Sequence, residues 1–171
     1  LGVGDNISKP NGRMGCVYKE VALIDEKGNV IPKIKLSNDT VKIVNPDYKK
    51  LYRAYSKSTG YALADIMCRK NEETNERELT IVSTIDPLKK NTITDFELVE
   101  LQKPIFKNGK LVYEDPDIFT KQKYCSDQMK TLYPEVKREK MPHEYYVDGT
   151  EEYVNFKNNM ISEYRSLVKK M

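Results

Sequence analysis

The chain has 171 residues, of which 39% are hydrophobic and 32% are charged, enough for one domain of ordinary size with a core of its own. No apolar run approaches the ~20 residues that a membrane-spanning helix requires. The three cysteines, Cys16, Cys68 and Cys125, lack the spacing of a disulfide framework or a cysteine zinc site. We therefore expect a cytoplasmic protein with reduced thiols and no contact with a membrane.

The net charge of +3 is unevenly distributed. Residues 1–60 carry eleven Lys and Arg against six Asp and Glu, whereas residues 61–171 carry eighteen against twenty. A nucleic-acid binder usually has a stronger basic excess, with exposed aromatic side chains between its basic ones, so we rank nucleic-acid binding last. The distribution favours a compact anion such as a phosphate ester, although ordinary solvated lysines explain the charge alone equally well.

The N-terminal segment opens with a glycine turn, Leu1-Gly2-Val3-Gly4-Asp5-Asn6, that no strand precedes. Because such turns normally follow a buried strand, we interpret the chain as the downstream part of a longer protein. Two predicted strands follow, Cys16–Ile24 and Val30–Leu36, and the turn Asp25–Asn29 joins them into a β-hairpin.

Runs of β-branched and aromatic residues predict antiparallel strands through the first two thirds of the chain. The turn Ser58-Thr59-Gly60, the polar loop Asn71–Glu76 and the tight turn at Asn108-Gly109 separate them. The predicted strands are Lys50–Ser56, Tyr61–Arg69, Leu79–Thr84, Phe96–Phe106 and Lys110–Tyr113.

The last third predicts two helices, so the expected fold class is α+β. Asp115 and Pro116 suit the start of the first helix, which ends before Pro134. The second begins near Thr150, and an apolar stripe along it predicts core packing or a subunit contact. The residues that recur at helical spacing, on one face of each helix, are Ile118, Gln122, Cys125, Met129 and Leu132 in the first helix, and Tyr153, Phe156, Met160, Tyr164 and Leu167 in the second.

The residue types and motifs in the sequence exclude several classes of catalytic site. His143 is the single histidine, so no histidine-rich zinc site is possible, and the glycine-rich nucleotide loops and the nucleophile elbow are missing. What remains is an anion site. Gly2 and Gly4 offer backbone N–H groups, and the nearby lysines offer point charges that suit phosphate. The candidate side chains are Lys19, Lys35, Ser37, Lys49 and Lys50.

Five ordered segments closely resemble the C-terminal part of the bacterial nicotinate phosphoribosyltransferase family. They are Gly2-Val3-Gly4, Gly15–Lys19, Ile31–Ser37, Lys103–Tyr113 and Pro142–Asp148. The resemblance implies an enzyme that joins nicotinate to phosphoribosyl pyrophosphate, with ATP hydrolysis, in NAD biosynthesis. It also implies Mg²⁺, a cytoplasmic setting and a homodimer formed through the full-length chain.

The same resemblance implies a division of the chain and a role for particular residues. Residues 1–50 would end an α/β barrel, and residues 51–171 would form an accessory domain of strands and two helices. Gly2, Gly4 and Lys19 would hold the phosphate of the ribosyl substrate. Lys35, Ser37, Lys49 and Lys50 would lie near ATP or pyrophosphate.

This sequence departs from the family pattern in two places. Asp5 stands where family loops commonly carry a hydroxyl residue, and its carboxylate would repel a phosphate unless it were turned away or bridged by Mg²⁺. The catalytic histidine of the family lies upstream of Leu1, so we expect these residues alone to be inactive. The alternative reading is a free-standing protein-interaction or assembly module with a vestigial phosphate turn.

Overall fold

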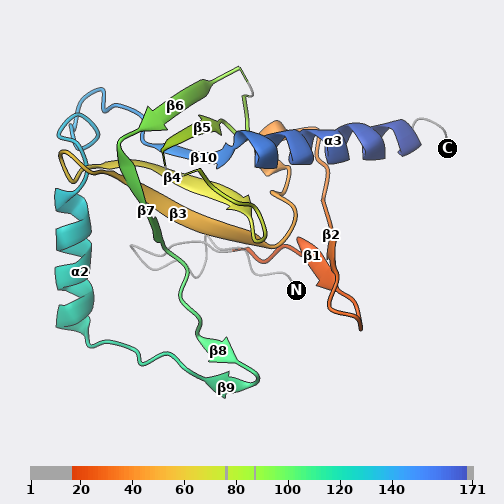
Figure 1. Cartoon of the computed structure of the whole chain (residues 1–171), viewed down its shortest axis with the longest axis horizontal. Helices are drawn as coiled ribbons and strands as arrows, with labels where there is room; N and C mark the ends of the chain where they lie inside the picture. The colour runs from red at the N-terminus through yellow and green to blue at the C-terminus, as the bar shows by residue number, and fades with distance from the viewer. Residues whose placement is uncertain (1–16, 76, 87, 169–171) are drawn as a thin grey trace, which may run out of the picture.

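The computed structural model describes residues 17–75, 77–86 and 88–168, and its centre is a six-stranded sheet (Figure 1). The strands lie in the order β6-β5-β10-β4-β3-β7. All neighbours pair antiparallel except β10 and β4, which run parallel, so the expected antiparallel-rich sheet is confirmed. The six strands are β3 (Lys49–Ser56), β4 (Ala62–Arg69), β5 (Glu78–Val82), β6 (Lys90–Thr94), β7 (Phe96–Glu100) and β10 (Tyr146–Thr150).

A single residue, Asp95, joins β6 to β7, although these strands lie at opposite ends of the hydrogen-bonded order. The sheet must therefore curl until its two edges approach each other, and Figure 1 shows β7 descending from the end of β6 across the sheet. Small side chains fit inside the curl, where Ala54 and Ala64 are fully buried. The other buried members of this core are Ile66, Leu79, Ile81, Ile93 and Phe96.

The predicted N-terminal hairpin is present, with shorter strands than expected. β1 (Ala22–Ile24) and β2 (Val30–Pro32) form a separate two-stranded sheet, and Gly28 has the positive φ of 83° that its turn requires. A 3-10 helix, η1 (Thr40–Lys42), then leads toward β3. The start of the first predicted strand, Cys16, lies outside the described residues.

A second small hairpin lies beyond β7. β8 (Phe106–Lys107) and β9 (Lys110–Leu111) pair antiparallel across Asn108-Gly109, whose φ angles are 51° and 74°. Positive φ at both central residues is the geometry that an Asn-Gly tight turn adopts, so the turn prediction is confirmed. The long strand predicted over Phe96–Phe106 is wrong, because pairing stops at Glu100 and resumes only in β8.

α3 (Glu151–Val168) begins where the sequence predicts and packs on the sheet through its first half only. Tyr153 and Val154 are buried against Val82, with Met67 and Phe156 beside them. The second half projects past the sheet (Figure 1). Of the predicted stripe, Tyr164 and Leu167 are therefore 39% and 50% exposed.

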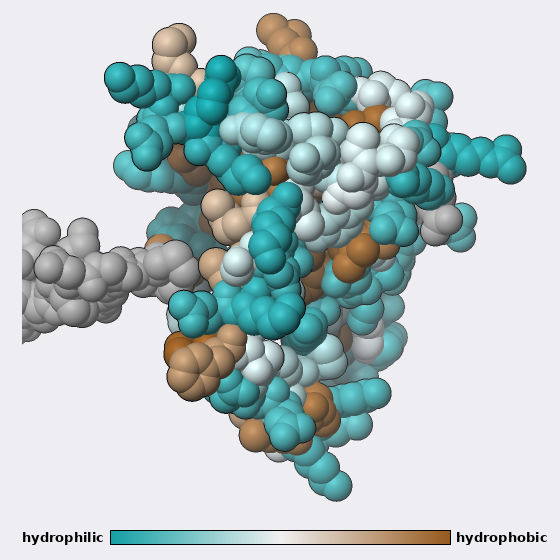
Figure 2. Space-filling view, turned by 90° about the vertical axis from the view of Figure 1, so that its left-hand side faces the viewer, coloured by the Kyte–Doolittle hydropathy of each residue, from teal (hydrophilic) through white to brown (hydrophobic). Residues whose placement is uncertain are grey.

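α2 (Ile118–Lys130) is confirmed as a helix, but its N-cap is Asp117 rather than Asp115. Asp117 accepts from the backbone N–H groups of Phe119 and Thr120, which is the usual N-cap contact. The helix has no buried residue, and Ile118 is 70% exposed. Figure 2 looks onto this side of the molecule, where hydrophobic groups stand among hydrophilic side chains. The spacing of Ile118, Gln122, Cys125, Met129 and Leu132 thus predicts the helix correctly, although these residues do not form a buried face.

Gly149→Ala tests the packing of α3 on β10. A Cβ at this position would lie 2.8 Å from Cδ1 of Tyr153 and 3.0 Å from Cγ2 of Val154, both in the buried core. We expect a loss of about 1–3 kcal/mol in unfolding free energy and a melting temperature lowered by roughly 2–10 °C. The control is Gly28→Asn, because nothing lies within 4 Å of a Cβ there and Asn tolerates positive φ. Equal melting temperatures for Gly149→Ala and wild type in a calorimetric scan would contradict this account.

Candidate functional site

Two of the predicted phosphate-binding lysines lie together. Lys19 and Lys35 line one surface cavity of about 330 Å³ with Glu20, Lys33 and Ile34, named here the lysine hollow. Three ammonium groups against one carboxylate give this cavity a positive charge. An ammonium group binds phosphate as a point charge, so the hollow is suited to a phosphate ester.

Backbone hydrogen bonds hold the two sides of the lysine hollow together. The Lys33 N–H donates to the carbonyl of Val21 at 2.8 Å, and Val21 lies two residues after Lys19. The Val44 N–H donates to the carbonyl of Lys35 at 3.4 Å. The spacing of the lysines therefore depends on main-chain pairing rather than on their own side chains.

The remaining predicted residues lie elsewhere. Gly2 and Gly4 fall outside the described residues. The Ser37 hydroxyl oxygen accepts from the Asp39 N–H at 3.2 Å, so it caps the turn before η1. Lys49 and Lys50 line a different cavity of about 300 Å³, which Lys70, Lys103 and Glu100 also line, with Tyr48, Gln102 and Pro104.

The Lys49 side chain is hydrogen-bonded to backbone carbonyls of its own chain. Its ammonium donates to the carbonyls of Asn45 and Asp47, both at 2.7 Å, and burial lowers its pKa. Lys50 points differently, with its Nζ 6.0 Å from the centre of the Tyr52 ring. The Lys49 ammonium is therefore bound to backbone carbonyls of the Asn45–Asp47 segment, whereas the Lys50 ammonium is not.

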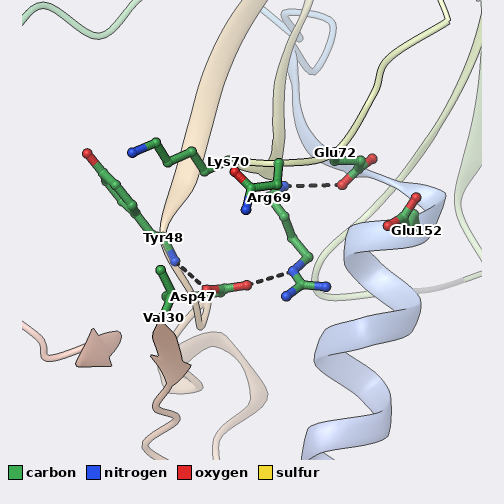
Figure 3. Close-up of a pocket in the computed structure, with 8 residues that line it drawn as sticks. Val30, Asp47, Tyr48, Arg69, Lys70, Glu72 and Glu152 are labelled. Carbon is green, nitrogen blue, oxygen red and sulfur yellow. Dashed lines mark hydrogen bonds and ion pairs between the residues drawn. The ribbon is translucent and has the colours of Figure 1, made fainter. Parts of the chain in front are cut away.

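The segment Asn45-Pro46-Asp47 is held by four side chains from β3, β4 and α3, and this set is named here the clamp. Beyond Lys49, the Tyr153 hydroxyl donates to the Pro46 carbonyl at 2.9 Å, and the Lys157 ammonium donates to Oδ1 of Asn45 at 2.7 Å. The Arg69 Nε pairs with Oδ2 of Asp47 at 2.6 Å, as Figure 3 shows. No sequence pattern pointed to the clamp, because Lys157 lies 112 positions from the Asn45 side chain that it holds.

Asp47 is the most constrained residue of the segment that the clamp holds. It is 3% exposed and has a φ of 74°, which is uncommon for a residue with a side chain. The guanidinium of Arg69 also lies 4.3 Å from the centre of the Phe156 ring, so α3 and Asp47 both position it. The buried carboxylate and its partner thus connect the segment before β3 to the sheet and to α3.

Figure 3 also shows a small cavity beside this ion pair, of about 120 Å³, lined by Glu72 and Glu152 among others. Ligand pockets usually measure about 300–1,000 Å³, so this one is too small for a nucleotide. Glu72 accepts from the Arg69 backbone N–H at 3.1 Å, and burial raises the pKa of its carboxyl.

A second polar network joins α2 to the sheet. Arg53 donates from Nε and Nη2 to the two carboxylate oxygens of Asp65, at 2.7 and 2.9 Å, and from Nη1 to Gln128 of α2 at 2.8 Å. Tyr145 donates to Asp65 at 3.0 Å, and burial raises its pKa. All three guanidinium nitrogens are used, so this network serves packing. Sequence reasoning missed it because its members are spread over four separate segments.

The described residues contain no group of three or more His, Cys, Asp or Glu that could hold a metal ion. His143 is exposed, and its backbone N–H donates to the Glu135 carbonyl at 2.9 Å. Cys68 is buried, and burial raises the pKa of its thiol to about 11, which disfavours the reactive thiolate. In the part of the chain that the structure describes, no helix is both long and apolar enough to cross a bilayer.

Comparison with solved structures gives the class of this fold. The crystal structure of human nicotinic acid phosphoribosyltransferase matches 68% of this chain and 23% of its own, with a TM-score of 0.59. The sequence identity is 20%, so this likeness concerns the fold alone. About two thirds of this chain thus has a fold similar to that of part of a phosphoribosyltransferase.

Sequence comparison gives the family. The family model "Nicotinate phosphoribosyltransferase C-terminal domain" matches residues 48–157. The chain belongs to the nicotinate phosphoribosyltransferase family, and the resemblance seen in the sequence is confirmed.

Curated relatives extend the match along the chain. A nicotinate phosphoribosyltransferase of Bacillus subtilis (strain 168) is 32% identical over 156 residues, and one of Caenorhabditis elegans is 28% identical over 161 residues. Each match covers 91% of this chain. The chain spans 32% of the length of the first relative and 28% of the second.

Glu72→Gln tests the buried acid beside the clamp. Because burial raises the pKa of Glu72 above its usual value of 4.5, the folded state binds this proton more tightly than the unfolded state. The stability that it contributes is therefore greatest below the unfolded pKa and is lost as pH rises through the folded pKa. We expect the unfolding free energy of Glu72→Gln, relative to wild type, to rise as the pH increases above 4.5.

Urea unfolding at a series of pH values measures this difference. The exposed neighbour Glu73, changed to Gln, is the matched control for the loss of one carboxylate from the same loop. A difference between Glu72→Gln and wild type that does not change with pH would mean that burial does not raise the pKa of the Glu72 carboxyl.

Proposed function

We propose that the protein carrying this domain is a nicotinate phosphoribosyltransferase. It would join nicotinate to phosphoribosyl pyrophosphate, forming nicotinate mononucleotide for NAD biosynthesis, with ATP hydrolysis as the coupled driver. The match of the family's C-terminal domain to residues 48–157 is the observation that carries this proposal. The names of the curated relatives support it, since each is described as nicotinate phosphoribosyltransferase.

The contribution of this chain would be to bind phosphate rather than to perform the chemical step. Lys19 in the lysine hollow would neutralise the phosphate of the ribosyl substrate, together with backbone N–H groups of Gly2 and Gly4, and Lys35 would face ATP or pyrophosphate from the same hollow. Lys50 would face ATP or pyrophosphate from its own cavity, where Lys49 supports the backbone. Mg²⁺ would arrive with these polyphosphates, whose oxygens it binds.

The proposed architecture has two parts and a dimer. Residues 1–50 would complete the barrel of the enzyme, residues 51–171 would form its C-terminal accessory domain, and the homodimer would form through the full-length chain in the cytoplasm. A protein-interaction module is the second candidate, favoured by the exposed apolar side chains of α2, among them Ile118 and Phe119 at 70% and 77% exposure.

We expect the protein isolated from its source cells to make nicotinate mononucleotide from nicotinate, phosphoribosyl pyrophosphate, ATP and Mg²⁺. The 171-residue chain alone should make none, because the catalytic histidine, which ATP phosphorylates in this family, is expected upstream of Leu1. Chromatographic assay of the nucleotide product measures both. Product from the isolated chain would overturn the division of roles, and no product from the isolated native protein would overturn the proposed function.

Lys19→Ala distinguishes the proposed enzyme function from the alternative of a protein-interaction module. Loss of one charge-assisted hydrogen bond to phosphate costs about 1.5–3 kcal/mol, so kcat/KM for phosphoribosyl pyrophosphate should fall roughly 10- to 100-fold in the native protein. Lys27→Ala is the matched control, since Lys27 lies in the turn between β1 and β2 and does not line the hollow. Unchanged kcat/KM in Lys19→Ala, with normal folding, would favour the module.

A further inference from the structure

We propose that Lys157 of α3 is a positioning residue for the lysine hollow. It fixes the Asn45–Asp47 segment, and Asp47 and the preceding Val44 carry the backbone hydrogen bonds that set the two sides of the hollow. The phosphate ligand of the hollow rests on the proposed function, whereas the coupling between α3 and the hollow rests on contacts within the chain.

The first step runs from α3 to Asn45. Lys157 is 3% exposed, and its ammonium donates to Oδ1 of Asn45 at 2.7 Å and to the Thr84 carbonyl at 3.0 Å. Both acceptors are neutral, and no ion pair of Lys157 is found among the described residues. Burying a charge without a carboxylate partner is costly. An apolar side chain would fill the same space without that cost, so the ammonium serves the directional contact to Asn45.

The second step keeps the segment in one conformation. The Pro46 carbonyl accepts from the Tyr153 hydroxyl at 2.9 Å, and the Asp47 carboxylate pairs with Arg69. Asp47 keeps its φ of 74° only while these partners hold it, because that region of backbone conformation is unfavourable for Asp. α3 and β4 therefore both hold the segment in this conformation.

The third step reaches the hollow. The Asp47 N–H donates at 2.9 Å to the Val21 carbonyl, which is the same oxygen that accepts from Lys33. The Val44 N–H donates to the Lys35 carbonyl. One side of the hollow, through Val21, is thus one hydrogen bond from the held segment, and the other, through Lys35, is one hydrogen bond from Val44, the residue that directly precedes the segment.

Lys157→Met in the 171-residue chain tests this coupling. We expect amide hydrogen exchange measured by NMR to become roughly tenfold faster at Lys33, Val44 and Asp47, while the paired amides of β3 and β4 keep their protection. Titration with inorganic pyrophosphate, followed by the amide shifts of Lys19, Lys33 and Lys35, should show an affinity weakened roughly five- to tenfold.

Arg53→Met is the matched control. It also removes a cation from a polar network on the sheet, but that network joins α2 and does not reach the Asn45–Asp47 segment. A general loss of stability would change both variants alike, whereas positioning predicts that Arg53→Met leaves the exchange and the pyrophosphate affinity of the hollow unchanged. If Lys157→Met does not fold, Tyr153→Phe removes only the donor to Pro46 and should give the same pattern, with changes of roughly threefold.

The outcomes separate the two proposals. Unchanged exchange at Lys33, Val44 and Asp47 overturns the coupling, and changed exchange with unchanged pyrophosphate affinity overturns the positioning role. A wild-type chain that binds no pyrophosphate overturns the phosphate role of the hollow, and the positioning role falls with it.

Discussion

The ion pair between Asp47 and Arg69 is the interaction on which the N-terminal part of the structure depends. The Asp47 carboxylate is almost fully buried, and its nearest opposite charge is the Arg69 Nε at 2.6 Å. Removing Arg69 would leave the buried Asp47 carboxylate without its cation, which is costly, whereas the Arg69 side chain itself is 41% exposed. The Asp47 N–H also bonds Val21. The ion pair therefore fixes the place where the β1–β2 hairpin joins the sheet.

The curl of the sheet is the second constraint, and it explains the small residues in the centre. A one-residue connection between β6 and β7 brings both edges of the sheet together, so strands on opposite sides approach closely. Ala54 and Ala64 are paired across β3 and β4 with no exposed surface, and larger side chains, such as Phe96, complete the same core. The outward residues of β4, Asp65, Met67 and Arg69, then serve the α2 network, the α3 core and the clamp.

Local chemistry explains what could be predicted from the sequence. The turns at Gly28 and Asn108-Gly109 depend on φ angles that few residues adopt, and α3 begins where two acidic residues suit a helix N-terminus. β6 was missed because it buries only Ile93, and β10 was missed because it contains Asp148 and Gly149, residue types that are depleted in strands. The lysine hollow could be predicted in part, since Lys19 and Lys35 lie on the two sides of one hairpin. The clamp could not, because Lys157 and Asn45 meet only through the tertiary fold.

The boundaries of the family match bear on what the C-terminal domain does. The match begins at residue 48 and ends at 157, so Lys49, Arg69, Tyr153 and Lys157 all lie within it. The segment that they hold, Asn45-Pro46-Asp47, lies immediately before it. The matched domain thus supplies all four side chains of the clamp, which are two ammonium groups, a guanidinium and a phenol, and the clamp binds the backbone that directly precedes the domain. A domain built in this way fixes the position of the residues before it, and those residues carry the lysine hollow.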